Sequence, residues 1–327
     1  MSRDLAALPK AHLHVHLEGA MRPATLDDLA AAAGVPSPPV REYDGFTEFV
    51  QRYQAADALV VTPLDLRRIV REVVEDAAAD GAVWVEPHFY PPRYVGRPGF
   101  GTVEEVTELV IDEGRAAAER LGIGCGIMIS ALRGFPVEQA TDLARLAARY
   151  ADAGVVSFGL AADESQWPPE PYAEAFAIAR EAGLISAPHA GELAGPASVL
   201  GALDALGARR ICHGVRSVED PALVERLASD GIVLDVCPTS NVLLQVVPDL
   251  EQHPLARLLD AGVRCTLNGD DPLLFGPGVL GEFELARTSL GLTDAQLAAM
   301  ARTSVEASGA PATIREPALA AIDGWTT

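Results

Sequence analysis

The chain has 327 residues, of which 49% are hydrophobic and 22% charged, and its formal net charge is −21. This length suits one large domain, and we expect a single domain over residues 1–327. The negative electrostatic field of the protein repels phosphate backbones, which excludes nucleic acid as a natural partner but not a small neutral molecule. No apolar run could span a bilayer and MSRDLAALPK lacks a signal peptide, so we expect a cytoplasmic protein without a membrane partner, its oligomeric state unknown.

Short β-type runs alternate with segments of helical periodicity along the chain. The predicted strands are 11–16, 82–89, 123–130, 155–160, 184–189, 210–213, 232–237 and 263–268. The predicted helical segments are 64–81, 102–122, 137–154, 171–183, 196–207, 217–231 and 253–262. Several of these segments end in glycine, as a helix C-cap should. Eight strands that alternate with helices predict an α/β protein with a closed (β/α)8 TIM barrel.

A doubly wound open sheet is the alternative architecture. It would normally carry a glycine-rich phosphate-binding turn after the first strand, and HLEGAMRP (16–23) is not such a turn. The connection 17–81 is too long for one helix, so we expect extra helices there that cover the barrel mouth. Residues 292–327 are expected to form terminal helices that pack on the outside.

Histidines and an aspartate stand where predicted strands end. His14 and His16 are two residues apart on the first strand and therefore point to the same face. His189 and His213 close the fifth and sixth strands, and Asp270 follows the eighth. The carboxyl ends of barrel strands meet at one mouth, and imidazole with carboxylate suits zinc but also iron, manganese or cobalt. These five residues predict one metal ion that keeps a position for water.

Two further carboxylates stand beside these residues. Glu192 lies three residues after His189 in HAGE, so the loop can turn it back towards the same pocket. Asp271 directly follows Asp270, and because adjacent side chains diverge, one can bind metal while the other faces a substrate. Taken alone, Glu192 could equally be a surface or helix-capping acid, and Asp271 a turn residue before Pro272.

Five motifs resemble, in order and spacing, those of the adenosine/adenine deaminase family. They are HLHVHLEG (12–19), HAGE (189–192), CHGV (212–215), CPTSN (237–241) and NGDDP (268–272). The resemblance extends over nearly the whole chain. It implies a barrel with one Zn²⁺ per chain that hydrolyses the exocyclic amine of a 6-aminopurine such as adenosine.

The resemblance also implies a role for each candidate residue. The metal ligands it implies are His14, His16, His189 and Asp270. His213 is implied to be a base that orients and deprotonates the metal-bound water, which removes it from the ligand set expected above. Glu192 is implied to be the acid that protonates ring N1, and Asp271 the acceptor for a protonated purine N7.

The residues expected around the substrate depart from the family pattern. Glu18 stands where many adenosine deaminases have Asp, at a position that contacts ribose, and adenine-specific members also tend to have Glu there. In GLAADE (159–164), Gly159 replaces Asp, and Ala162 stands where the amide of a glycine meets purine N3. The other departures are His12 for Glu, His88 for Arg and Gly269 for Ser or Thr. Adenine, or a modified adenine nucleoside such as aminodeoxyfutalosine, is therefore the alternative substrate.

Other classes of protein share parts of this pattern. A ligand-binding barrel that kept the metal but lost turnover would not need Glu192, His213 and Asp271. Esterases and lactonases of the amidohydrolase type commonly carry a bridging lysine after the fourth strand, and VVSFGLAADES (155–165) contains none. Zinc deaminases of the cytidine type need a P-C-x-x-C motif, which is absent from this chain. We therefore expect an adenosine deaminase-type hydrolase.

Overall fold

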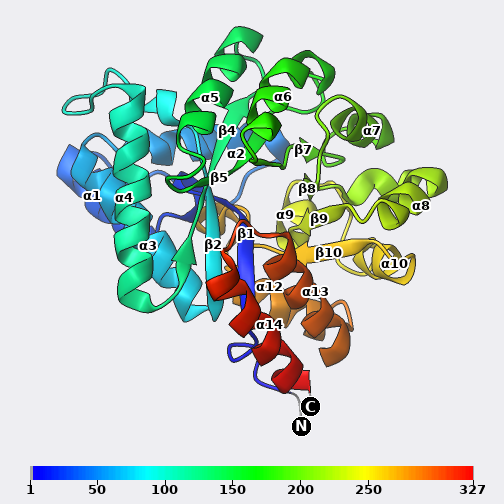
Figure 1. Ribbon diagram of the computed structural model, residues 1–327. Coiled ribbons are helices and arrows are strands. Elements are labelled where there is room, and N and C mark those ends of the chain that lie inside the picture. The colour runs from blue at the N-terminus through cyan, green and yellow to red at the C-terminus, as the bar shows by residue number, and fades with distance from the viewer. Residues whose placement is uncertain (1–2, 327) are drawn as a thin grey trace.

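The computed structural model describes residues 3–326, whose strands are surrounded by helices (Figure 1). The strands are β1 (Lys10–His16), β2 (Ala82–Phe89), β3 (Gly124–Cys125), β4 (Ile127–Leu132), β5 (Val155–Ala161), β6 (Ile185–Ser186), β7 (His189–Ala190), β8 (Arg210–His213), β9 (Val233–Val236) and β10 (Arg264–Leu267). They pair in parallel as two arcs, β1-β2-β4-β5-β6 and β10-β9-β8-β7, with β3 also beside β2.

Hydrogen bonds link the two arcs at the first seam. Residues 185–190 form one interrupted strand that contains β6 and β7. The amide of Ala187 donates to the carbonyl of Phe158 in β5 at 3.0 Å, and the amide of Cys212 in β8 donates to the carbonyl of Pro188 at 3.0 Å. This strand therefore has one arc on each side.

The second seam lies between β1 and the end of β10. Val15 and Asp270 form a parallel bridge. The amide of His16 donates to the carbonyl of Asp270 at 2.9 Å, and the amide of Asp270 donates to the carbonyl of His14 at 3.0 Å. With β3–β4 and β6–β7 each counted as one interrupted strand, residues 3–326 supply the eight strands that the sequence predicts. The predicted (β/α)8 architecture is confirmed.

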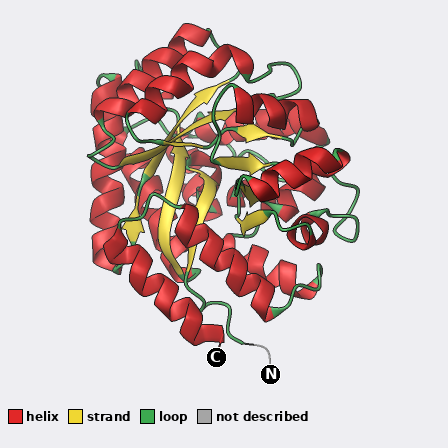
Figure 2. Cartoon of the chain, turned by 45° about the vertical axis from the view of Figure 1, so that its right-hand side comes forward, coloured by secondary structure: helices red, strands yellow, loops and turns green. Residues whose placement is uncertain are grey.

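Helices cover the outside of this ring (Figure 2). Those that follow or precede barrel strands are α3 (Pro63–Ala79), α4 (Val103–Leu121), α5 (Val137–Arg149), α6 (Ala173–Glu181), α7 (Pro196–Asp204), α8 (Pro221–Ser229), α10 (Leu255–Asp260) and α13 (Asp294–Ala307). The additional ones are α1 (Pro23–Ala33), α2 (Gly45–Asp57), α9 (Pro238–Leu243), α11 (Pro272–Phe275), α12 (Val279–Thr288) and α14 (Ala312–Thr326). Four short 3₁₀ turns occur in residues 3–326: η1 (Glu18–Ala20), η2 (Pro91–Arg93), η3 (Glu170–Tyr172) and η4 (Val215–Glu219).

Local signals in the sequence set several helix ends. The side chain of Thr102 accepts the amide of Glu105, whose carboxylate accepts the amide of Thr102, so α4 begins at a capping box. It ends at Gly122, whose φ of 71° favours glycine. Thr62 and Asp65 form the same box at the start of α3.

The long connection 17–81 contains η1, α1 and α2 before α3, as expected of extra helices at the barrel mouth. Helix α2 supplies Phe49, Val50 and Tyr53 to the wall of the large chamber described below. Helices α9, α11 and α12 were not predicted; α9 and α11 are short helices that follow β9 and β10, and α12 follows α11.

Buried ion pairs link three strands inside the barrel, below its mouth. Arg210 of β8 lies 2.8 Å from Oε2 of Glu86 on β2 and 3.0 Å from Oδ2 of Asp235 on β9. All three side chains are fully buried. A buried charge is tolerated when it is paired, so loss of any one member would leave an uncompensated charge in the core.

The C-terminal segment closes the opposite end of the barrel. Helix α13 packs on β1 and β10 from outside, as predicted. The turn after it brings Ala310 against Ala11, Leu13 and Trp84, whose indole donates to the buried Glu86. This end of the barrel is therefore sealed by apolar side chains, and access to the interior is from the mouth.

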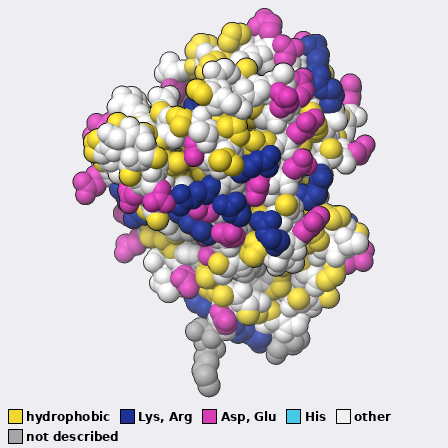
Figure 3. Space-filling view, turned by 90° about the vertical axis from the view of Figure 1, so that its left-hand side faces the viewer, with side chains coloured by type: hydrophobic (Ala, Val, Ile, Leu, Met, Phe, Trp, Pro, Cys, Tyr) yellow, Lys and Arg dark blue, Asp and Glu magenta, His cyan; other side chains and the backbone are white. Residues whose placement is uncertain are grey.

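The face over α1, α3 and α4 carries basic and acidic side chains together (Figure 3). Arg68 lies 2.8 Å from both Asp28 and Glu72, and Arg22 lies 2.6 Å from Asp76. These two arginines are therefore paired with acidic neighbours. In residues 3–326 no helix has the length and apolar character to cross a membrane.

Candidate active site

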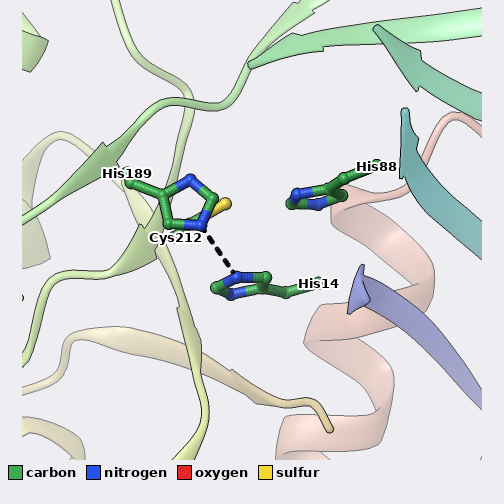
Figure 4. Close-up of side chains that lie close together, drawn as sticks. All are labelled: His14, His88, His189 and Cys212. Atoms are coloured by element: carbon green, nitrogen blue, oxygen red, sulfur yellow. Dashed lines mark hydrogen bonds between the residues drawn. The ribbon is translucent and has the colours of Figure 1, made fainter. Parts of the chain in front are cut away.

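The structure brings together the four side chains expected to bind metal. Nε2 of His189 lies 3.1 Å from Nε2 of His14 and 3.3 Å from Nε2 of His16. Oδ1 of Asp270 lies 3.2 Å from Nε2 of His14 and 3.3 Å from Nε2 of His16. Figure 4 shows His14 and His189 directed at each other from β1 and β7.

These separations fit a four-coordinate cation. A tetrahedron with edges of about 3.2 Å has a centre about 2.0 Å from each corner, the usual distance from zinc to imidazole nitrogen. Nδ1 of His14 lies 3.2 Å from the carbonyl oxygen of Asp235, which can only accept, so Nδ1 carries the proton and Nε2 keeps its lone pair for a metal. The donor set therefore suits a divalent cation such as zinc.

Cys212 and His88 also lie beside this cluster (Figure 4). Burial raises the pKa of the Cys212 thiol well above its ordinary value, and its Sγ lies 3.6 Å from the carbonyl oxygen of Ala187, to which it donates. The His88 ring stacks on His14, with ring centres 5.0 Å apart, and its Nε2 bonds to the carbonyl of Leu13. His88 thus stands behind a ligand and supports its ring.

Two residues of the site have a left-handed backbone conformation. His213 and Asp270 have φ values of 66° and 58°, in the left-handed region that costs non-glycine residues free energy. Asn268 stabilises the adjacent strand β1, because its Oδ1 accepts hydrogen bonds from the amides of Leu13 and His14 at 2.8 and 3.0 Å. The strained backbone of His213 and Asp270 is typical of functional sites.

Glu192 and His213 face each other beside the cluster. Oε1 of Glu192 lies 3.3 Å from Nε2 of His213. Burial, with the neighbouring Asp270 carboxylate, raises the pKa of Glu192 well above its ordinary value, so this acid retains a proton at neutral pH. Burial lowers the pKa of His213 to about 3. The site therefore pairs a neutral acid with a neutral imidazole.

The loop that carries Glu192 is held by a residue to which the sequence assigned no role. The buried carboxylate of Glu164 accepts the amides of Gly191, Glu192, Leu193 and Ala194, the last three at 3.0, 2.9 and 3.2 Å. Four donors on one carboxylate fix the turn after β7. Its position in GLAADE, three residues after a strand end, was the only signal that could have indicated it.

Asp271 lies beside the cluster in a closely packed corner. Burial and the Asp270 carboxylate raise the pKa of Asp271 well above its ordinary value, and Oδ1 has no hydrogen-bond partner among residues 3–326. A Cβ atom on Gly19 would lie 1.6 Å from this oxygen. Glycine at position 19 is therefore required for the observed position of Asp271, which leaves a carboxyl group available to a ligand.

A chamber of about 540 Å³ opens beside these groups. Its near wall contains His16, His189, Glu192, His213, Asp270 and Asp271. Its far wall contains Phe46, Phe49, Val50 and Tyr53 of α2, with Tyr90, Arg93 and Phe135. Ala162 also lines it, with a φ of 75°. The chamber is thus polar at the cluster and largely apolar away from it.

Glu18 is absent from the chamber wall, although the sequence predicted contact with a substrate. Its Oε2 accepts the hydroxyl of Tyr53 at 2.9 Å, and its Oε1 accepts that of Tyr94 at 2.6 Å. Burial, with the Glu18 carboxylate, raises the pKa of both tyrosines well above the ordinary value, so both remain donors. Tyr53 lies on α2 and lines the chamber, so Glu18 reaches the chamber only through this tyrosine.

The remaining departures from the family pattern have packing explanations. A Cβ atom on Gly159 would lie 2.6 Å from Oγ of Ser130, so a larger residue there would require the Ser130 side chain to move. A Cβ atom on Gly269 would lie 2.9 Å from the carbonyl oxygen of Pro277. The amide of Gly269 donates to Nε2 of His12 at 3.0 Å, so two of the departures contact each other.

Comparisons with known proteins agree with this geometry. A family model described as adenosine deaminase matches residues 9–325. A putative adenosine/adenine deaminase of Streptomyces coelicolor is 44% identical over 338 residues, which cover 99% of this chain and 98% of that protein.

Solved structures give the same result. An adenine deaminase from Arthrobacter aurescens has a TM-score of 0.89 at 30% identity, covering 97% of this chain and 99% of that chain. An amidohydrolase from Burkholderia ambifaria with bound Zn has a TM-score of 0.87 at 28% identity, covering 98% of this chain and 92% of that chain. The chain therefore belongs to the adenosine deaminase family and is a deaminase of the hydrolase class.

Proposed function

We propose that this protein is a zinc-dependent hydrolase of a 6-aminopurine nucleoside, which converts adenosine or a close analogue into the 6-oxo product and ammonia. It would thus act on the C–N bond of a cyclic amidine. The observation that carries this proposal is the buried carboxyl group of Glu192, 3.3 Å from His213 and adjacent to four convergent side chains that can bind a metal. The relative with bound Zn supports zinc as the metal.

His14, His16, His189 and Asp270 would hold the zinc. A bound zinc supplies a water of lowered pKa as the nucleophile. Glu192 donates its proton to purine N1, which makes C6 electrophilic. His213 orients the attacking oxygen, and Asp271 contacts purine N7. Oδ1 of Asp271 has no hydrogen-bond partner among residues 3–326 and is therefore available for this contact.

The size of the chamber favours a nucleoside over a free base. Its volume of about 540 Å³ is several times that of a purine ring, and α2 contributes Phe46, Phe49, Val50 and Tyr53 to its wall away from the cluster. A free base would leave that part to water. The polar groups converge at the cluster, where the aminopurine edge must lie for C6 to react.

Two observations favour other substrates. The relative from Arthrobacter aurescens is an adenine deaminase, which supports free adenine as the alternative. Phe46, Phe49 and Phe135 give the far wall an apolar surface, which suits a modified adenine nucleoside such as aminodeoxyfutalosine that carries a bulkier substituent.

A substrate screen tests these proposals. The zinc-loaded protein is assayed for ammonia release from adenine, adenosine, deoxyadenosine and N6- or 5′-modified nucleosides. We expect the highest kcat/KM for a nucleoside. A higher value for adenine would reverse the substrate assignment, and no ammonia from any aminopurine, with zinc bound, would refute the function.

Ala162→Gly is expected to raise the free energy of unfolding by about 1 kcal/mol, because the native φ of 75° is strained for alanine. It also removes a methyl group from the chamber wall, so we expect kcat/KM for a nucleoside to rise. Urea unfolding and steady-state kinetics measure the two effects. Ala161→Gly is the matched control, and it should destabilise the protein because Ala161 lies in a strand. Equal changes in the free energy of unfolding for both variants would contradict backbone strain at Ala162.

A further inference from the structure

A chain of hydrogen bonds leads from His213 away from the chamber. Nδ1 of His213 lies 3.2 Å from Nδ2 of Asn241, and Oδ1 of Asn241 lies 3.2 Å from Nε2 of His253. Nδ1 of His253 lies 3.2 Å from the backbone nitrogen of Leu255. All three side chains are buried, so water does not compete for these contacts.

The direction of every bond in this chain follows from its outer end. The amide of Leu255 can only donate, so Nδ1 of His253 accepts and the ring proton of His253 is on Nε2. That proton is donated to Asn241, which fixes the carbonyl oxygen of its amide towards His253. The amide nitrogen of Asn241 must then face His213 and donate to Nδ1. Nδ1 of His213 is therefore an acceptor.

We propose that Asn241 and His253 are positioning residues that hold the ring proton of His213 on Nε2, so that His213 enters the site as a hydrogen-bond donor. Nε2 lies 3.3 Å from Oε1 of Glu192, which can accept this proton, and 3.8 Å from Oδ2 of Asp270, which is beyond hydrogen-bond distance. The catalytic meaning of this inference rests on the proposed function, whereas the position of the ring proton follows from the hydrogen bonds alone.

The tautomer has two consequences for the reaction. When Nε2 of His213 donates to Oε1 of Glu192, the carboxyl proton of Glu192 must be on Oε2. Glu192 then has that proton free for the substrate nitrogen. In this tautomer His213 can orient an attacking oxygen by donating to it, which is the orienting part of the role expected for this residue.

Nuclear magnetic resonance of the zinc-loaded protein tests the proton position without substrate. The chain has 7 histidines, so ¹⁵N–¹H correlation spectra of the ring nitrogens can be assigned by loss of the His213 signals in His213→Asn. We expect an unprotonated Nδ1 and a protonated Nε2 for His213. A protonated Nδ1 would overturn the proposal, even if the protein proves to be an efficient deaminase.

Three variants separate positioning from mere packing. Glutamine at position 253 can both donate to Asn241 and accept from Leu255, whereas phenylalanine keeps ring volume and does neither. We expect His253→Phe to lower kcat by roughly 10- to 100-fold, with KM and zinc content little changed, and His253→Gln to restore most of the loss. Asn241→Asp, whose oxygens only accept, should move the His213 proton to Nδ1 in the spectrum. Equal losses in His253→Phe and His253→Gln, or an unchanged spectrum in Asn241→Asp, would contradict the proposal.

Discussion

Replacement of Glu192 by Gln is expected to lower kcat by roughly 10²–10⁴-fold, the usual contribution of a positioned general acid. The amide has nearly the same shape but cannot donate a proton to purine N1. Zinc should remain bound, because the four-ligand cluster of His14, His16, His189 and Asp270 does not include Glu192. Steady-state kinetics with metal analysis of the same samples measures both quantities.

The pH profile gives a second test of the same residue. The raised pKa of Glu192 keeps its acid form at neutral pH, and kcat should fall as pH rises through that pKa. This alkaline limb should disappear in Glu192→Gln. The matched control is Glu225→Gln, on the exposed side of α8, which should leave kcat and the profile unchanged. Wild-type kcat in Glu192→Gln would remove the residue from its proposed role.

Removal of zinc is expected to abolish activity, and addition of zinc to restore it. Because a ligand that binds only the folded state stabilises it by mass action, zinc at 100 times its Kd should add about 2.7 kcal/mol. For a protein of this size the melting temperature should rise by roughly 5 °C. Calorimetry of the chelated and reloaded protein measures this shift.

His16→Asn removes one ligand where folding is least at risk, since the His16 side chain is 17% exposed whereas that of His14 is fully buried. We expect zinc affinity to fall by more than about 100-fold, because even residues that only support metal ligands contribute 10- to 100-fold. Cys125→Ala removes a half-buried thiol outside the cluster and serves as the control. Equal zinc affinity in His16→Asn and the control would place the metal elsewhere.

The barrel and the residues at its mouth could be predicted because they rest on local patterns. Alternation of strands and helices indicated the ring, and histidines at strand ends indicated where the cluster forms. The side-chain spacing of His14 and His16 required only the two-residue period of a strand. Each of these signals is contained in a few consecutive residues.

The residues that hold the site in place could not be predicted, because their partners are distant in sequence. Glu164 binds amides 27 to 30 residues away. Asn241 contacts His213 across 28 residues, and Arg133 donates to the carbonyl of His189 across 56. A buried acid, amide or guanidinium has no periodic signature, so only the packed structure identifies its partner.

The place of Glu18 limits how the chamber can change during evolution or design. Its two oxygens are occupied by hydroxyls from α2 and from the end of η2, so a shorter or uncharged side chain at this position would leave a tyrosine without its acceptor. Substrate preference therefore cannot be changed by a substitution at position 18 alone. Positions 18, 53 and 94 form one coupled unit, and a viable path between substrates must change them in compatible combinations.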